Sequence, residues 1–176
     1  MAGNLIEKTP SAYEYPLLVK HLLTTALANS PEQEIVHYNG GRYTLRDLRE
    51  RIGRLASGLA RLGVEPGDTV GVMDWDSPRY LEAYFAVPMM GAVLHTLNVR
   101  LSPEQLLYTI EHAEDKVILV HKDFLPLLDA IKGRIATVKK YVLIADGGER
   151  PEGAVPFAAE YEEMMEKGDP DYPFPD

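Results

Sequence analysis

Asn98 and Arg100 are the side chains best placed for ligand chemistry in this sequence. They lie on a short polar turn between the apolar segment Ala92–Thr96 and the tetrad Ser102-Pro103-Glu104-Gln105. The apolar segment predicts a short buried strand, and the tetrad predicts a helix start with Ser102 as N-cap. Because parallel α/β sheets place ligand contacts in the loops that follow strands, the turn is a candidate binding site. An ordinary strand-to-helix corner with a solvated arginine gives the same pattern, and spacing alone favours that simpler interpretation.

His95 belongs to the same stretch, inside the predicted strand. The chain has five histidines, and none has metal-ligand spacing with another, so the sequence argues against a zinc site. A core histidine with a satisfied hydrogen bond is the favoured interpretation of His95. The histidines are His21, His37, His95, His112 and His121.

Two acids, Asp74 and Asp76, follow the predicted buried strand Thr69–Met73. They could indicate a metal or acid–base site, but no third ligand is near in sequence and Ser77-Pro78 begins a helix directly. Cap and turn roles are therefore favoured for Asp76 and Ser77. The sequence also lacks a defensible Ser/His/Asp order, a carboxylate pair at helical spacing in a plausible cleft, and a glycine-rich phosphate loop. We therefore predict no catalytic residue and no metal site in this chain.

The clearest element that positions these residues is the helix predicted over Thr44–Leu62. Its leucines and one isoleucine recur at steps of three and four, which forms one apolar stripe. Thr44 is the expected N-cap, with Asp47 in the first turn, and Gly63 is the expected stop.

The other predicted elements alternate between strands and helices, which is typical of a parallel sheet with helical crossovers. The fold class is therefore α/β, with a mostly parallel sheet flanked by helices and an N-terminal β-hairpin closed by Asn39-Gly40. The expected hairpin arms are Ile35–Tyr38 and Arg42–Thr44, and the expected sheet strands are Thr69–Met73, Ala92–Thr96, Val117–Val120 and Tyr141–Ala145. The further expected helices are Leu17–Ala28, Pro78–Met90, Pro103–Ala113 and an acidic helix over Phe157–Lys167. In the helix Pro78–Met90, the residues expected to face inward are Leu81, Tyr84, Phe85 and Val87. One more helix is expected to be capped by Asp123, with Phe124, Leu127, Leu128 and Ile131 facing inward.

We expect three regions along the chain. Residues 1–30 form an N-terminal segment and helix, and residues 31–146 form the α/β subdomain. Residues 147–176 form a loop, the short acidic helix and a Pro-rich, acidic linker to a missing downstream domain.

Composition limits the possible partners. The chain has 176 residues, a formal net charge of −9 and no cysteine. Its acidity argues against a nucleic-acid surface, which needs a basic stripe. No apolar run is long enough to span a membrane, and the N-terminus lacks a secretory pattern, so a cytoplasmic location is expected.

Two blocks of this sequence resemble the N-terminal part of AMP-forming acyl-CoA synthetases, which belong to the adenylate-forming superfamily. They are YTLRDLRERIGRLASGLARLGVEPGDTVGVM and YLEAYFAVPMMGAVLHTLNVRLSPEQLLYTIEHAEDKVILV. The second is most similar to medium- and long-chain fatty-acid–CoA ligases, and the resemblance covers roughly residues 17 to 176.

The resemblance implies a two-step reaction that uses ATP, Mg²⁺ and CoA. A fatty acid and ATP give acyl-AMP and pyrophosphate, and CoA then displaces AMP to form the thioester. The family's phosphate loop and catalytic lysine are absent from this sequence, so the chain alone is expected to be inactive and to carry no cofactor. A stand-alone α/β ligand-binding or interaction module remains the alternative.

The resemblance also implies roles for individual residues and for assembly. Arg100 matches an arginine that lies near the CoA phosphates in some relatives, and its planar fork suits a phosphate. Asn98 and His95, its neighbours, are included in this candidate CoA-phosphate site. Fatty-acid relatives dimerise through their N-terminal domains, so a homo-oligomer, in particular a dimer, is expected.

Overall fold

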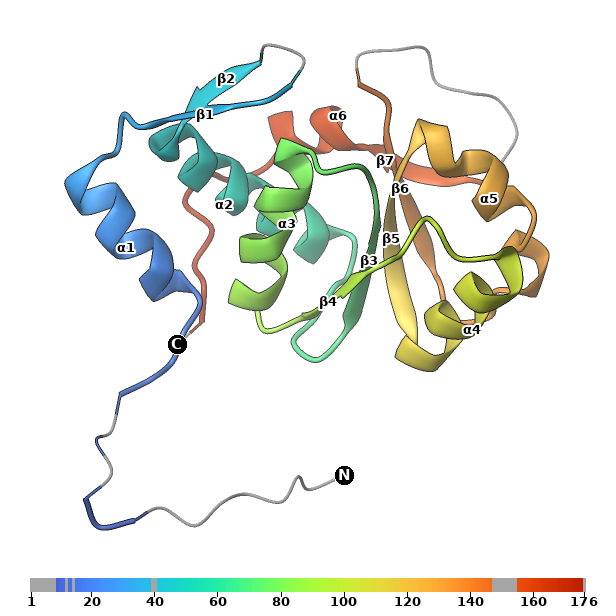
Figure 1. Cartoon of the computed structure of the whole chain (residues 1–176), viewed down its shortest axis with the longest axis horizontal. Coiled ribbons are helices and arrows are strands. Elements are labelled where there is room, and N and C mark those ends of the chain that lie inside the picture. Colours follow the sequence, from blue (N-terminus) through green and yellow to red (C-terminus); the bar gives the residue numbers. More distant parts are fainter. Residues whose placement is uncertain (1–8, 12, 14, 39–40, 147–154, 176) are drawn as a thin grey trace.

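The computed structural model describes residues 9–11, 13, 15–38, 41–146 and 155–175. A five-stranded parallel sheet with strand order β4-β3-β5-β6-β7 lies between two layers of helices, and a two-stranded antiparallel hairpin, β1-β2, sits at one side (Figure 1). The predicted α/β class is confirmed. The sheet strands are β3 Thr69–Met73, β4 Val93–Thr96, β5 Asp115–His121, β6 Lys140–Ile144 and β7 Phe157–Glu160, and the hairpin strands are β1 Glu34–Val36 and β2 Arg42–Thr44.

Two apolar cores form because alternate residues of each strand face opposite layers. On one face, Val70 and Val72 pack with helices α1 Lys20–Asn29, α2 Leu45–Arg61, α3 Pro78–Met89 and α6 Tyr161–Glu166. On the other face, Met73 and Ile118 pack with α4 Pro103–Ala113 and α5 Leu125–Asp129. Short 3₁₀ turns over Lys122–Phe124 and Lys132–Arg134 flank α5.

Local signals fix the helix ends as expected. Thr44 and Asp47 form a capping box at α2, and Ser102 and Gln105 form the same motif at α4. Gly63 ends the α2 segment and Gly91 the α3 segment, each with a positive φ, of 84° and 83°.

The strand predicted over Ala92–Thr96 is present as β4, but the prediction that it is buried was wrong, because β4 is an edge strand. It pairs only with β3 among the described strands, and Val93 is 52% exposed. Apolar composition alone does not distinguish an edge strand from a central one.

Two helix predictions also need correction. In α3, Glu82 is buried and Tyr84 is exposed, because the helix turns the Glu82–Ala83–Ala86–Val87 stripe toward the core and Glu82 has buried polar partners. Asp123 does not cap a helix. It lies inside the 3₁₀ turn after β5, where the His121 side chain accepts the hydrogen bond of the Asp123 backbone N–H.

Further boundaries differ from the predictions at both ends. The first helix begins at Lys20, whereas Leu17 is 93% exposed and outside it. Phe157–Glu160 is strand β7 and not part of the acidic helix, because it pairs in parallel with β6. The hairpin turn at Asn39-Gly40 lies outside the described residues, as does the loop over 147–154.

The final described stretch, residues 168–175, packs along α2. The Arg49 guanidinium donates to the Pro170 carbonyl over 2.7 Å, and the Arg54 guanidinium donates to the Gly168 carbonyl over 3.0 Å. Tyr172 and Phe174 are partly buried and pack against the core on the α2 side of the sheet. The division of the chain into the three regions given above stays a prediction.

Candidate functional site at the carboxyl edge of the sheet

The chain reverses its direction across the sheet between β3 and β5. It leaves β3 for β4 on one side, then returns to place β5 on the other side of β3. In open parallel sheets, ligands bind at the carboxyl ends of the strands that flank such a reversal. Asp74 follows β3, and His121 ends β5, so both lie at this point.

Asp74 is the buried carboxylate of this edge, with 6% of its surface exposed. It accepts hydrogen bonds from the Trp75 backbone N–H over 2.7 Å and from the Ser77 hydroxyl. Burial raises the pKa of Asp74 above its usual value, against the effect of the Ser77 and Trp75 hydrogen bonds. Because Ser77 is also the N-cap of α3, the predicted cap role of Ser77 is confirmed, and Asp74 holds that cap in place.

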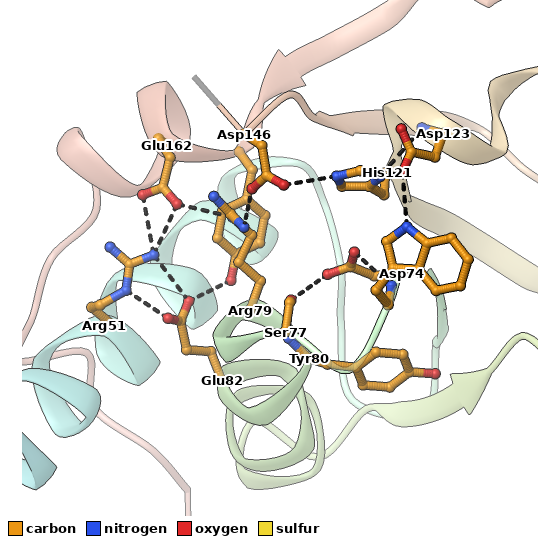
Figure 2. Close-up of polar contacts among 12 residues, drawn as sticks. Arg51, Asp74, Ser77, Arg79, Tyr80, Glu82, His121, Asp123, Asp146 and Glu162 are labelled. Atoms are coloured by element: carbon orange, nitrogen blue, oxygen red, sulfur yellow. Dashed lines mark hydrogen bonds and ion pairs between the residues drawn. The ribbon is translucent and has the colours of Figure 1, made fainter. Parts of the chain in front are cut away.

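His121 is buried and has a defined tautomer. Its Nδ1 accepts from the Asp123 backbone N–H over 3.2 Å, so its Nε2 carries the proton and donates to Asp146 Oδ2 over 2.9 Å. Asp123 in turn accepts from the Trp75 indole N–H over 2.9 Å, which joins the loops after β3 and β5 (Figure 2).

Charged side chains extend this network toward α2 and α6. Arg79 donates to Asp146 Oδ1 over 2.5 Å and to Glu162 Oε1 over 3.1 Å. Partial burial opposes ionisation of Asp146, but the His121 hydrogen bond and the Arg79 charge hold its pKa below the usual value. Asp146, which follows β6, is therefore an anion that holds both the His121 imidazole and the Arg79 guanidinium (Figure 2).

Glu82 lies at the inner end of the network and is fully buried. Arg51 Nε donates to its Oε1 over 2.6 Å, and the Tyr161 hydroxyl donates to its Oε2 over 2.6 Å. Burial raises the pKa of Glu82 despite these hydrogen bonds. The cluster ties α2, α3 and α6 together and so fixes the helices beneath the carboxyl edge.

The structure places the three predicted site residues in two separate environments. Asn98 Oδ1 accepts from the Arg100 backbone N–H over 3.0 Å, which forms the turn after β4, and both side chains are exposed. Within the described part of the chain, the Arg100 side chain has no ion-pair partner. His95 instead contacts Asp115, with 2.9 Å between Nδ1 and Oδ2, so its polar partner is on β5 and not on the turn.

Sequence reasoning missed the network around Arg79 and Glu82. His121 and Asp146 directly follow the predicted strands Val117–Val120 and Tyr141–Ala145, so the rule that selected the turn after β4 would also have selected them. An acid inside an apolar helix stripe, such as Glu82, is a further signal of a buried ion pair. The arginine partners gave no signal, because an exposed arginine and a partly buried one look alike in sequence.

The described residues offer neither a cluster of metal ligands nor a membrane-spanning helix. Among the described residues, no group of three or more His, Asp and Glu side chains is arranged to hold a metal ion. Within the same part of the chain, no helix combines the length and the apolar character that crossing a bilayer requires.

The parallel sheet with helices on both faces defines an α/β protein, and comparisons with known proteins give its family. Residues 23–174 match the AMP-binding enzyme family. The chain therefore belongs to the AMP-binding enzyme family, and the predicted resemblance to AMP-forming acyl-CoA synthetases is confirmed.

Individual relatives are CoA ligases. A long-chain-fatty-acid–CoA ligase of Thermus thermophilus is 46% identical over 73% of this chain and 23% of its own length. A 3-methylmercaptopropionyl-CoA ligase of Ruegeria lacuscaerulensis is 36% identical over 91% of this chain and 30% of its own length. The chain thus spans less than a third of either relative.

Comparison with solved structures also finds a CoA ligase. A crystal structure of a long-chain-fatty-acid–CoA ligase from Archaeoglobus fulgidus matches with a TM-score of 0.76 and 20% identity, over 98% of this chain and 34% of that one. At this identity the match supports the fold, which is that of one part of these larger ligases.

Proposed function

We propose that this chain is the N-terminal part of a fatty-acid–CoA ligase acting on medium- or long-chain fatty acids. The observation that carries the proposal is the 46% identity to a long-chain-fatty-acid–CoA ligase. The carboxylate of the fatty acid attacks the α-phosphorus of ATP, the bond to pyrophosphate breaks, and acyl-AMP forms. The CoA sulfur then attacks the acyl carbon as its thiol proton is lost, and AMP leaves.

Within this proposal, ATP, Mg²⁺ and CoA serve the protein that contains the chain. Mg²⁺ would neutralise the phosphate charge. Since the described residues include no group of three or more metal-binding side chains, we assign none of them to Mg²⁺. The chain's own residues position the carboxyl edge through the Asp74, His121 and Asp146 contacts.

Arg100 is the proposed contact to a CoA phosphate. Its exposed guanidinium has no ion pair with another described residue, and Asn98 fixes its backbone at the carboxyl end of β4. Arginine pairs with phosphate through two parallel hydrogen bonds, so a free guanidinium at this edge suits the role. His95 contributes to this site only by supporting β4, since its polar contact is Asp115. A cytoplasmic location and a homodimer complete the proposal.

The test is activity of the protein that contains this chain. Pyrophosphate release and thioester formation should both occur with fatty acids of medium or long chain and should both require ATP and Mg²⁺. The isolated chain should do neither. Preferential activity with 3-methylmercaptopropionate would contradict the substrate class, and absence of pyrophosphate release with every carboxylate would contradict the reaction.

A further inference from the structure

A polar pocket of about 230 Å³ lies between the β1-β2 hairpin and helices α2, α3 and α6. It shares no residue with the Asn98–Arg100 turn. We call it the hairpin pocket. Its lining residues include His37, Arg42, Tyr43, Arg51, Arg79, Glu82 and Glu162, with Gly41 and Pro78 completing it.

The acceptors of the hairpin pocket already have donors. Both Glu82 oxygens receive hydrogen bonds, one from Arg51 Nε and the other from the Tyr161 hydroxyl and Arg51 Nη2. Both Glu162 oxygens receive hydrogen bonds from Arg51 Nη2, and Oε1 receives one from Arg79 Nε as well (Figure 2). Each carboxylate oxygen of Glu82 and Glu162 therefore already accepts at least one hydrogen bond.

The donors of the pocket are not all used. Tyr43 Oη and His37 Nε2 are buried and have no hydrogen-bond partner. Among the described residues, Arg51 Nη1 and Arg79 Nη2 have no partner either, since the contacts of both guanidinia run through Nε and one Nη. Buried polar groups in proteins nearly always have partners, so the Tyr43 and His37 atoms indicate a missing acceptor. The two guanidinium nitrogens are not among the buried atoms and add further donors beside them.

Tyr43 is protonated under ordinary conditions and can donate. Burial raises its pKa to about 12, and the Glu82 charge adds to that effect. His37 Nε2 donates in one of its two neutral tautomers. Tyrosine, histidine and the two guanidinia can therefore all act as donors toward one occupant.

We propose that the hairpin pocket binds a small oxyanion, namely a phosphate or carboxylate group. Three arginines and two glutamates line it, and Arg42 and Arg79 have further carboxylate partners in Glu34 and Asp146, so the unpaired donors and not an excess of charge would hold the anion. Arginine forks pair with such groups through parallel hydrogen bonds. The volume is below the ~300–1,000 Å³ typical of drug-sized ligands, which favours a single anionic group over a whole nucleotide.

The test is calorimetry and amide chemical-shift mapping of the full chain with inorganic phosphate and with acetate at constant ionic strength. At least one of them should bind in the millimolar range or tighter, with shifts centred on Tyr43 and Arg79. Methyl phosphate and propionate then show whether the oxyanion is a free ion or the end of a larger ligand. A site for free ions excludes these larger compounds, whereas a site for the end of a larger ligand accepts them. Either pattern supports an oxyanion site.

Tyr43→Phe is the diagnostic variant, because it removes the open hydroxyl and little else. It should weaken binding about ten- to a hundredfold, as expected for loss of a hydrogen bond to a charged group. Tyr108→Phe, at a tyrosine that is 67% exposed and outside the pocket, is the matched control and should bind normally. Without ligand, Tyr43→Phe should be as stable as the parent chain. No binding of either anion, shifts centred elsewhere, or equal binding by both variants would overturn the proposal.

Discussion

The His95 imidazole and the Asp115 carboxylate meet across strand β3, above Gly71. The two residues belong to β4 and β5, which lie on either side of β3, and Nδ1 is 2.9 Å from Oδ2. A Cβ atom at Gly71 would lie 3.0 Å from Asp115 Oδ2, so the glycine leaves the space in which the pair forms. Asp115 is fully buried, and among the described residues His95 is its only side-chain hydrogen-bond partner.

Replacing His95 should therefore destabilise the sheet edge. His95→Leu is expected to lower the free energy of unfolding by about 3 kcal/mol near neutral pH, because it leaves a buried carboxylate without a partner. His95→Gln, which can still donate to Asp115, should lose less. Urea unfolding of the two variants checks the difference, and equal losses would show that the imidazole acts through packing alone.

The pH dependence of the His95→Leu loss follows from Asp115. Burial raises the pKa of this carboxyl, and the His95 hydrogen bond and charge oppose that shift. Without His95, the folded chain binds a proton at higher pH than the unfolded chain does. The variant therefore loses stability as pH rises between the Asp115 pKa of the unfolded chain and that of the folded chain. Its loss of stability relative to the parent chain should shrink as pH falls toward about 4.

The two capping boxes should respond differently to acid. The Thr44 backbone hydrogen bond, followed by the Thr44 hydroxyl, holds the pKa of Asp47 below its usual value, whereas Gln105 in the α4 box does not ionise. Thr44→Ala and Ser102→Ala should each cost about 1 kcal/mol at neutral pH. Because a lowered carboxyl pKa gives stability that is lost as pH falls, only the Thr44→Ala cost should decrease below about pH 4. Parallel pH titrations of stability would contradict this if both costs stayed constant.

Tyr161→Phe should destabilise the junction of α2, α3 and α6. The buried hydroxyl donates to Glu82 Oε2 over 2.6 Å, and hydrogen bonds to charged groups are worth about 1.5–3 kcal/mol. The control is Tyr80→Phe, whose hydroxyl has uncharged partners, the Val72 carbonyl at 3.4 Å and the Thr96 side chain. Thermal unfolding should show the larger shift for Tyr161→Phe, and a reversed order would contradict the role of this cluster.

Gly53→Ala should release the stretch over 168–175 from α2. A Cβ at Gly53 would lie 2.1 Å from the Pro170 carbonyl oxygen, so that backbone must move. The expected cost is about 1–3 kcal/mol, together with faster amide exchange over this stretch. Gly133→Ala, where nothing lies within 4 Å of the added carbon, is the control. Unchanged exchange in Gly53→Ala would mean that α2 shifts instead.

Arg100→Ala tests the proposed CoA contact in the protein that contains this chain. Loss of a charge-assisted hydrogen bond should raise the KM for CoA about ten- to a hundredfold. Acyl-AMP formation, measured as pyrophosphate exchange without CoA, should barely change. A loss of both half-reactions would assign Arg100 a structural role at the start of α4, and no change would make it a solvated charge.

Much of the fold could be predicted because its signals are local. The capping residues Thr44 and Ser102, the stops at Gly63 and Gly91 and the strand over Thr69–Met73 each depend on neighbouring residues alone. Strand β7 escaped prediction, because Phe157–Glu160 becomes a strand by pairing with β6, a partner distant in sequence.

The site was harder to predict for a related reason. The turn at Asn98 was identified by its position after a strand, but the direction of a side chain depends on the sheet. His95 was grouped with Arg100 by sequence proximity, whereas the order β4-β3-β5 brings it to Asp115. Likewise, Glu82 finds Arg51 and Tyr161 on two other helices, which no local pattern specifies.

Trp75 gives the carboxyl edge an intrinsic fluorescence reporter. It is the only tryptophan in the chain, its indole N–H donates to Asp123, and its ring lies 4.7 Å from that of Phe124. Since 46% of the residue is exposed, its emission responds to whatever replaces water at that face. Ligand docking or a neighbouring domain that closes over the edge would shift the emission to shorter wavelength, without any added label.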